Sequence, residues 1–310
     1  MSRKLRVGAA QIGPVLREES REHIVDRHIA LIEEAARRKV ELVVYPECSL
    51  TTWFPRFLIN DSQLDKFFEK SMPNPSVQPL FDRAKELGVG FVLGYGERDG
   101  DKQFNSSILV GKDGAIIGKY RKSHIGGTYE PILGRKFQYM ERRYFLPGDT
   151  GFKIWPAFGG YMGMGICYDR RWPEFWRVMG MQGAELVAIG FCSGGRSGGS
   201  HLGVFHHQLC LQAGAYWSGM WVVASAHCGE EEEGYTLMGH SAIVSPSGEI
   251  IAESYTIEDE LIDTTIDLDE TIRRPNFSPR VHRDNAIFVR DRRPEFYKAI
   301  ADPEWDGVPT

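Results

Sequence analysis

Three side chains that could do chemistry together each follow an apolar stretch of the sequence. Glu47 ends "VVYPE", Lys122 ends "GKYRK" and Cys167 ends "GMGIC". Each stretch is typical of a buried strand, and sites in open α/β sheets form at the carboxyl ends of strands. The sequence therefore predicts that a carboxylate, an ammonium and a thiol meet at one edge of a sheet.

This set of groups would support acyl transfer through a cysteine nucleophile. A thiol with an ordinary pKa of about 8.5 is mostly protonated at neutral pH, so Cys167 needs a base, and Glu47 could take its proton. Lys122, together with a backbone N–H, could stabilise the oxyanion of the tetrahedral intermediate. A helix that is expected to begin near Pro173 would also favour the thiolate.

Two arginines follow the candidate nucleophile in the stretch "CYDRRWPE". Because a guanidinium binds carboxylates bidentately, Arg170 or Arg171 could hold a carboxylate of the substrate. They could instead be structural partners of Asp169 and Glu174. The residues alone leave both interpretations open.

Apolar runs and turn signals predict the elements that position these residues. Strands are expected at 5–13, 40–47, 89–97, 105–111, 115–122, 161–169, 184–190, 220–227 and 240–254, the last folding back at a Pro-Ser-Gly turn. Helices are expected at 21–38, 76–88, 173–183 and 204–219. This alternation predicts one α/β domain over residues 1–310, with a mixed sheet covered on both faces. The Pro- and Arg-rich segment from about residue 270 is expected to be an arm that packs on a partner subunit or on its own body.

Composition bounds the class of protein. The chain has 310 residues, of which 42% are hydrophobic and 25% charged, so a sizeable core is expected. A formal net charge of -5 gives no reason to expect a nucleic-acid or membrane partner. No apolar run approaches the roughly 20 residues that span a bilayer. Five cysteines without a C-x-x-C pair favour reduced thiols and the cytoplasm.

Three further motifs have plain interpretations. The pair His206–His207 lacks the spacing of a metal site, so packed histidines are favoured. The run "SGGRSGG" at 193–199 lacks the Gly-Lys-Ser/Thr of a phosphate-binding loop and is expected to be a flap over the pocket. The four glutamates at 230–233 are most simply a solvated turn.

Longer stretches resemble the nitrilase superfamily of carbon–nitrogen hydrolases, in the order of that family and over about residues 5–300. The stretches are "VVYPECSLTTWFP", "GKYRKSH", "ERRYFLPGD" and "GICYDRRWPE". The resemblance implies a four-layer αββα sandwich and a homodimer or homotetramer assembled through paired helices. It implies the catalytic triad Glu47, Lys122 and Cys167, with Glu141 as a second glutamate of the site. It also implies that no metal or organic cofactor is needed.

Within the superfamily, the chain is most similar to the N-carbamoyl-D-amino-acid amidohydrolases. The similarity implies hydrolysis of an N-carbamoyl amino acid to the amino acid, ammonia and carbon dioxide through a carbamoyl-cysteine. In this interpretation Arg170 or Arg171 holds the substrate carboxylate, and His124 matches a position that lines the site.

Three positions around the implied substrate depart from that pattern. Tyr168 replaces an asparagine after the nucleophile, Tyr139 replaces a histidine, and Cys192 with the loop after it replaces an asparagine and a Pro- and His-containing loop. The substrate could therefore be a β-ureido acid, an N-acyl amide or a primary amide. Two alternatives come from other classes. A catalytically silent binding or scaffold protein is opposed by the intact triad. A Cys-His protease is opposed by the lack of a protease signature.

Overall fold

Two six-stranded sheets pack face to face in the computed structural model, which describes residues 2–195, 200–271 and 292–302. The first sheet has the order β14-β1-β2-β3-β4-β5, with the bounds β14 Glu260–Asp267, β1 Lys4–Gln11, β2 Leu42–Val44, β3 Gly90–Asp99, β4 Lys102–Val110 and β5 Ile116–Arg121. The second has the order β13-β12-β9-β8-β7-β6, with the bounds β13 Ile250–Glu253, β12 Ala242–Val244, β9 Trp221–Ala226, β8 Leu186–Phe191, β7 Gly160–Ile166 and β6 Ile154–Ala157. A separate ribbon pairs β10 Cys228–Glu231 with β11 Tyr235–Met238.

Parallel pairing is confined to the centre of each sheet. It joins β1, β2 and β3 in the first sheet and β7, β8 and β9 in the second. The outer strands pair antiparallel, including the hairpin β4–β5 and the predicted hairpin β12–β13. Because parallel strands end at the same edge of a sheet, β7 and β8 bring the residues that follow them into one region. Gly190 of β8 also packs closely against the backbone of Glu47, in the loop beyond β2 of the other sheet.

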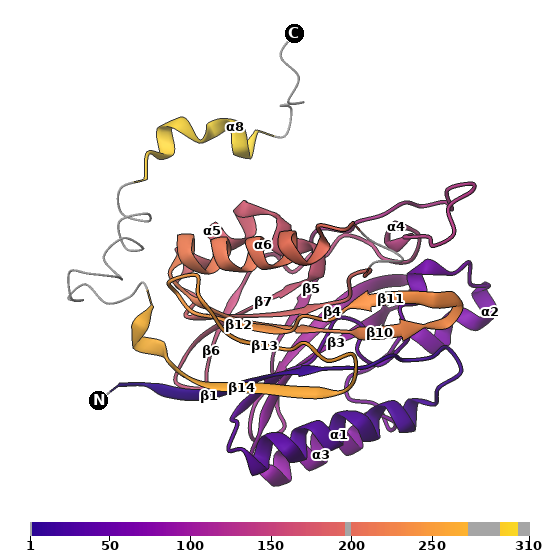
Figure 1. Ribbon diagram of the computed structural model, residues 1–310, viewed down its shortest axis with the longest axis horizontal. Helices are drawn as coiled ribbons and strands as arrows, with labels where there is room; N and C mark the ends of the chain where they lie inside the picture. The colour runs from indigo at the N-terminus through magenta and orange to yellow at the C-terminus, as the bar shows by residue number, and fades with distance from the viewer. Residues whose placement is uncertain (1, 196–199, 272–291, 303–310) are drawn as a thin grey trace.

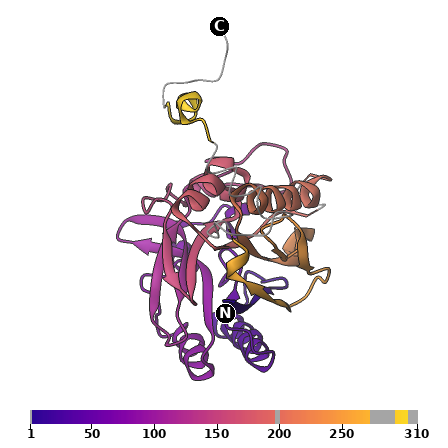
Figure 2. The same cartoon turned by 90° about the vertical axis from the view of Figure 1, so that its left-hand side faces the viewer.

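Helices cover the outer face of each sheet (Figures 1 and 2). Helices α1 Arg21–Arg37 and α3 Gln78–Leu87 lie on one side of the molecule, and α5 Pro173–Gln182 and α6 Gly203–Ser218 lie on the other. Short helices are α2 Asp61–Leu64, α4 Glu141–Tyr144 and α8 Lys298–Ala301. This is the αββα sandwich that the family resemblance implied.

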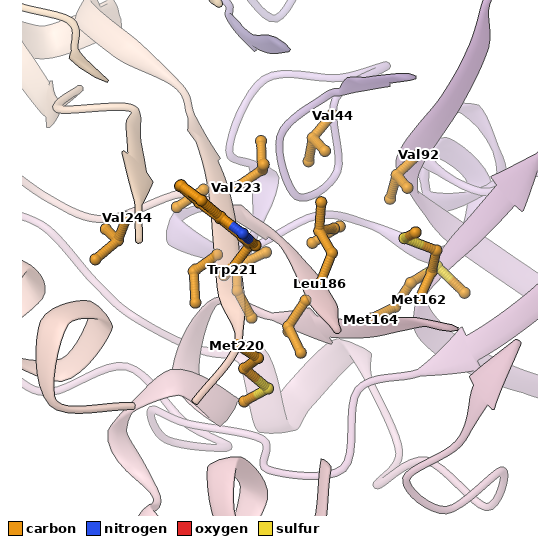
Figure 3. Close-up of a cluster of buried hydrophobic side chains, with 14 of the residues drawn as sticks. Val44, Val92, Met162, Met164, Leu186, Met220, Trp221, Val223 and Val244 are labelled. Carbon is orange, nitrogen blue, oxygen red and sulfur yellow. The ribbon is translucent and has the colours of Figure 1, made fainter. Parts of the chain in front are cut away.

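The main core lies between the two sheets. Val44 and Val92 of the first sheet approach Met164, Leu186 and Val223 of the second, and all five are almost fully buried (Figure 3). Burying a side chain of this size stabilises the fold by about 1.5–3 kcal/mol. The interface therefore fixes one sheet on the other, and with them the loops at the strand ends.

Local signals predicted the long elements well and the short ones poorly. The predicted helix ends at Gly88 and Gly183 are confirmed, because both glycines cap their helices with positive φ. The strand expected at 40–47 covers only Leu42–Val44, so Glu47 lies in the loop beyond β2. Strands β6, β10, β11 and β14 were not predicted. Of the expected C-terminal arm, residues 272–291 and 303–310 lie outside the described residues.

No helix within the described residues is long and apolar enough to cross a membrane. The described part of the arm, residues 292–302, approaches helices α5 and α6. Arg292, Tyr297 and Ile300 line a cavity together with Trp176 of α5 and Trp217 of α6.

Candidate active site

Lys122 joins two glutamates in a fully buried cluster. It directly follows β5, and its Nζ lies 2.7 Å from Glu47 Oε1 and also donates to Glu141 Oε1. All three side chains have no exposed surface. Two carboxylates thus share one ammonium, which is the pairing a buried charge requires.

Each glutamate is held by further donors from distant segments. Glu47 accepts from Asn105 Nδ2 at 2.7 Å and from the Cys192 backbone N–H at 2.9 Å. Glu141 accepts from the Gly126 backbone N–H at 3.0 Å and from the Tyr139 hydroxyl at 2.9 Å. These bonds fix the direction in which each carboxylate points.

Burial and charge shift the pKa values of the cluster in opposite directions. Burial raises the pKa of Glu47 above its usual value, an effect that Lys122 partly opposes. Burial also opposes the charge of Lys122, but the Glu141 and Glu47 carboxylates hold the pKa of this ammonium well above its usual value. Lys122 therefore stays a cation, whereas Glu47 is readily protonated.

Cys167 directly follows β7 and begins a short 3-10 turn over Cys167–Arg171. Its φ of 45° lies in the left-handed region, which costs a non-glycine residue conformational energy. The thiol is almost buried and donates to the Cys192 carbonyl at 3.5 Å. Burial and the Glu47 carboxylate raise the pKa of the thiol, Lys122 and Arg170 lower it, and the net result is a pKa of about 11. The thiol is therefore protonated at neutral pH.

Asp169 ties the turn of Cys167 to the first sheet. Its carboxylate accepts from the Ile166 backbone N–H at 3.0 Å and from the Tyr120 hydroxyl of β5 at 2.8 Å. The predicted site residue His124 also binds it, with Nδ1 at 2.8 Å, and its ring stacks on Trp172 at 4.6 Å. His124 therefore lies against the nucleophile turn.

The two arginines have different environments. Arg170 is 1% exposed and donates to the Cys167 carbonyl at 2.6 Å, to Ser193 Oγ at 2.9 Å and to His207 Nδ1 at 3.1 Å. Arg171 is exposed. From the sequence, Asp169 and Glu174 were possible structural partners of the arginines. Arg170 instead binds a carbonyl, a hydroxyl and an imidazole.

The three positions that depart from the carbamoylase pattern also lie in this region. The ring of Tyr168, which is half-buried, meets Trp172 edge to face at 5.9 Å. Tyr139 donates to Glu141, and its ring lies 6.4 Å from that of Trp53. Cys192 contributes its main chain, which contacts both Glu47 and Cys167.

The prediction of a solvated turn at 230–233 is wrong for Glu231. This residue ends β10, is 3% exposed, accepts from the Trp53 backbone N–H at 3.2 Å and lies 3.5 Å from Arg56 Nε. Burial raises the pKa of its carboxyl to about 7. The error arose because a run of glutamates looks solvated, although alternate residues of a strand point to opposite faces.

Sequence reasoning missed three residues that hold the site: Asn105, Ser193 and His207 as a partner of Arg170. A signal existed for Asn105, because it is a polar residue inside the apolar strand "FNSSILV". His207 is fully buried, as expected for a packed histidine.

Within the described ranges, no group of three His, Cys, Asp or Glu side chains is arranged to hold a metal ion. Residues 196–199 of the expected flap lie outside those ranges.

Comparison with known proteins identifies the family. A family model described as Carbon-nitrogen hydrolase matches residues 6–276. An N-carbamoylputrescine amidase of Oryza sativa subsp. japonica is 31% identical and covers 89% of this chain and 88% of its own length. A citrullinase of Francisella tularensis subsp. tularensis is 30% identical, with 87% and 89% covered. A solved carbon-nitrogen hydrolase of Helicobacter pylori has a TM-score of 0.81 at 25% identity, with 97% and 99% covered. The chain therefore belongs to the carbon–nitrogen hydrolase family of amide-cleaving enzymes.

Proposed function

We propose that the chain hydrolyses the carbamoyl C–N bond of N-carbamoyl compounds, and of N-carbamoyl-D-amino acids in particular, with Cys167 as nucleophile. The observation that carries this proposal is the buried cluster of Glu47, Lys122 and Glu141 beside a strained cysteine. A protonated thiol needs a base at the moment of attack, and a carboxylate with a raised pKa is well matched to that task.

In the first step the Cys167 sulfur attacks the carbamoyl carbon while Glu47 takes the thiol proton. The carbonyl oxygen becomes an oxyanion, which Lys122 and the Tyr168 backbone N–H stabilise. The intermediate collapses as the C–N bond to the leaving amine breaks, and Glu47 gives that amine the proton. The amine departs and leaves a carbamoyl group on sulfur.

In the second step Glu47 removes a proton from water, which attacks the carbamoyl carbon. The C–S bond breaks, and the proton returns from Glu47 to the Cys167 sulfur. The carbamic acid released decomposes to ammonia and carbon dioxide. Glu141 positions Lys122 throughout, because it shares that ammonium with Glu47.

The carbamoyl class is supported by the names of two relatives, an N-carbamoylputrescine amidase and a citrullinase, whose substrates carry this group. For amino-acid substrates we assign the carboxylate to Arg171, the exposed arginine of the pair. Tyr168, Tyr139, Cys192 and His124 border the nucleophile and would shape the rest of the pocket.

The test is ammonia release from a panel of purified substrates. The panel comprises N-carbamoyl-D- and L-amino acids, a β-ureido acid, N-carbamoylputrescine, an N-acyl amide and a primary amide. We expect turnover of carbamoyl substrates that Cys167→Ala abolishes and that Cys210→Ala, a change at a thiol in α6, leaves intact. Activity that survives Cys167→Ala would refute the mechanism, and activity on primary amides alone would refute the carbamoyl class.

We also propose a homodimer or homotetramer in a reducing, cytoplasmic environment. The five cysteines are all free thiols. Helices α5 and α6 expose apolar side chains, which are Val178, Met181, Phe205, Leu209 and Trp217. Light scattering of Phe205→Glu beside the unchanged chain tests the assembly: an unaltered mass would exclude this face.

A further inference from the structure

We propose that Arg170 stabilises the Cys167 thiolate and holds the nucleophile turn, and that it does not bind the substrate carboxylate. This inference rests on the proposed function only in taking Cys167 as the nucleophile. It assigns a catalytic role to a residue that the sequence associates with substrate recognition.

The contacts of Arg170 converge on the nucleophile. Its Nη1 lies 2.6 Å from the Cys167 carbonyl oxygen and 3.5 Å from Cys167 Sγ. Its Nη2 donates to Ser193 Oγ at 2.9 Å, and that hydroxyl is itself 3.9 Å from Sγ. One guanidinium therefore binds both the main chain and the side chain of a residue whose φ is unfavourable.

The charge of Arg170 is not balanced by a carboxylate in the resting site. The side chain is 1% exposed, and its hydrogen-bond acceptors are a carbonyl, a hydroxyl, an imidazole and a thiol. Over residues 2–195, 200–271 and 292–302, the ion pairs of the structure include none for Arg170. Burying an unpaired cation is costly, and this cost falls when the neighbouring thiol becomes an anion.

Lys122 is poorly placed to stabilise the Cys167 thiolate alone. Its ammonium already binds Glu47, in the loop after β2, and Glu141, in α4. When Cys167 passes its proton to Glu47, the negative charge moves to the sulfur, while Lys122 still pairs with the Glu141 carboxylate. Arg170 is the second cation that lowers the pKa of the thiol, and it approaches from the turn of the second sheet.

His207 holds the guanidinium of Arg170 in place. Its Nδ1 accepts from Arg170 Nε at 3.1 Å, and its Nε2 donates to the His240 carbonyl at 3.1 Å. Both Arg170 and the His207 ring pack on Phe191, at 4.7 Å and 4.3 Å. Burial and the adjacent guanidinium hold the pKa of His207 well below its usual value, so the ring stays a neutral acceptor. His207 is thus a positioning residue for Arg170.

The test measures thiol reactivity without substrate. Iodoacetamide is neutral and carries no carboxylate, so the rate at which it labels Cys167, followed by peptide mass spectrometry against pH, reports the thiolate alone. We expect Arg170→Met to slow labelling at neutral pH roughly tenfold or more and to raise the apparent pKa by about one unit. Arg170→Lys should give an intermediate rate, and Arg171→Met should label like the unchanged chain.

Turnover provides the second arm. If Arg170 acts on the thiol, Arg170→Met lowers kcat equally for N-carbamoyl amino acids and for N-carbamoylputrescine, which has no carboxylate. Normal labelling, with a rise in KM for the carboxylate substrates only, would overturn the inference and make Arg170 a substrate ligand. Circular dichroism checks the fold of each variant. If Arg170→Met does not fold, His207→Phe tests the same contacts through the residue that positions Arg170. This variant should slow labelling by a smaller factor. Unchanged labelling would count against the role of Arg170.

The two proposals can fail separately. If the unchanged chain labels rapidly at Cys167 but the Arg170→Met variant labels equally fast, only the role of Arg170 is wrong. If Cys167→Ala retains ammonia release, the proposed function itself is wrong.

Discussion

At the scale of single residues, the site depends on hydrogen bonds that set the charge of Glu47. In the proposed mechanism Glu47 is the general base, which must be ionised before it can accept the thiol proton. Lys122 and Asn105 both donate to Oε1 of this carboxylate, and the Cys192 N–H donates to Oε2. Donors to the charged form lower a carboxyl pKa, so they offset part of the rise that burial causes.

Replacing Asn105 with leucine therefore raises the pKa of Glu47 further. We expect kcat/KM at neutral pH to fall roughly tenfold to a hundredfold, the value of a hydrogen bond to a charged group. The acidic limb of the pH profile should move to higher pH, because Glu47 stays protonated over a wider range. Ser107→Ala, two residues along β4, is the matched control. A profile that falls in height without moving along the pH axis would contradict this account.

At the scale of elements, the sequence predicted what a local pattern encodes. Long apolar runs identified the central strands, and glycines marked the ends of α3 and α5. The ribbon β10–β11 was missed because its strands are only four residues long and the first ends in glutamates, which look solvated in the sequence. What buries Glu231 is the loop of Trp53 and Arg56, some 175 residues earlier in the sequence. Such a contact has no local signal.

The buried carboxyl of Glu231 makes stability depend on pH. Its pKa is raised from 4.5 to about 7 in the folded state, so the folded chain binds more protons than the unfolded chain between these values. Stability from this group is therefore present below pH 4.5 and is lost as pH rises to about 7, by roughly 3 kcal/mol at most. Glu231→Gln should remove this loss.

Urea unfolding at a series of pH values checks that prediction. We expect the free energy of unfolding of Glu231→Gln to exceed that of the unchanged chain at pH 8 and the difference to shrink toward pH 5. Glu230→Gln, at the exposed neighbour on the same strand, should give a curve parallel to that of the unchanged chain. The free energies of unfolding of Glu231→Gln and of the unchanged chain could instead differ by the same amount at every pH. That result would show that Glu231 does not titrate in this range.

At the scale of the whole molecule, the sequence predicted which residues form the cluster but not how they are held. Glu47, Lys122, Glu141 and Cys167 could be placed because each lies in a distinctive local stretch. The bonds that orient them join remote segments: Asn105 is 58 residues from Glu47, and His207 is 37 residues from Arg170. The first bond joins β4 to the loop after β2 within the first sheet, and the second joins α6 to the turn after β7. No single stretch of sequence describes either pairing.

The main chain of Glu47 lies between the two sheets, and glycines of both sheets make room for it. A Cβ at Gly94 of β3 would lie 2.4 Å from the Pro46 carbonyl oxygen and 2.8 Å from Glu47 Cα. A Cβ at Gly190 of β8 would lie 2.8 Å from the Glu47 backbone nitrogen. Since backbone cannot yield as a flexible side chain does, an added methyl group at either position must displace the main chain of Glu47.

Gly190→Ala should therefore lower kcat on the order of a hundredfold, the cost of displacing a catalytic group by about 1 Å. Gly163→Ala of β7 is the matched control, because its Cβ would meet the Met179 sulfur at 3.0 Å, near the end of a side chain that can move. Steady-state kinetics beside circular dichroism separates the two variants: both should keep the fold, and only Gly190→Ala should lose turnover. Equal activity of the two would mean that the position of Glu47 tolerates displacement, and that the close fit of the two sheets serves stability rather than catalysis.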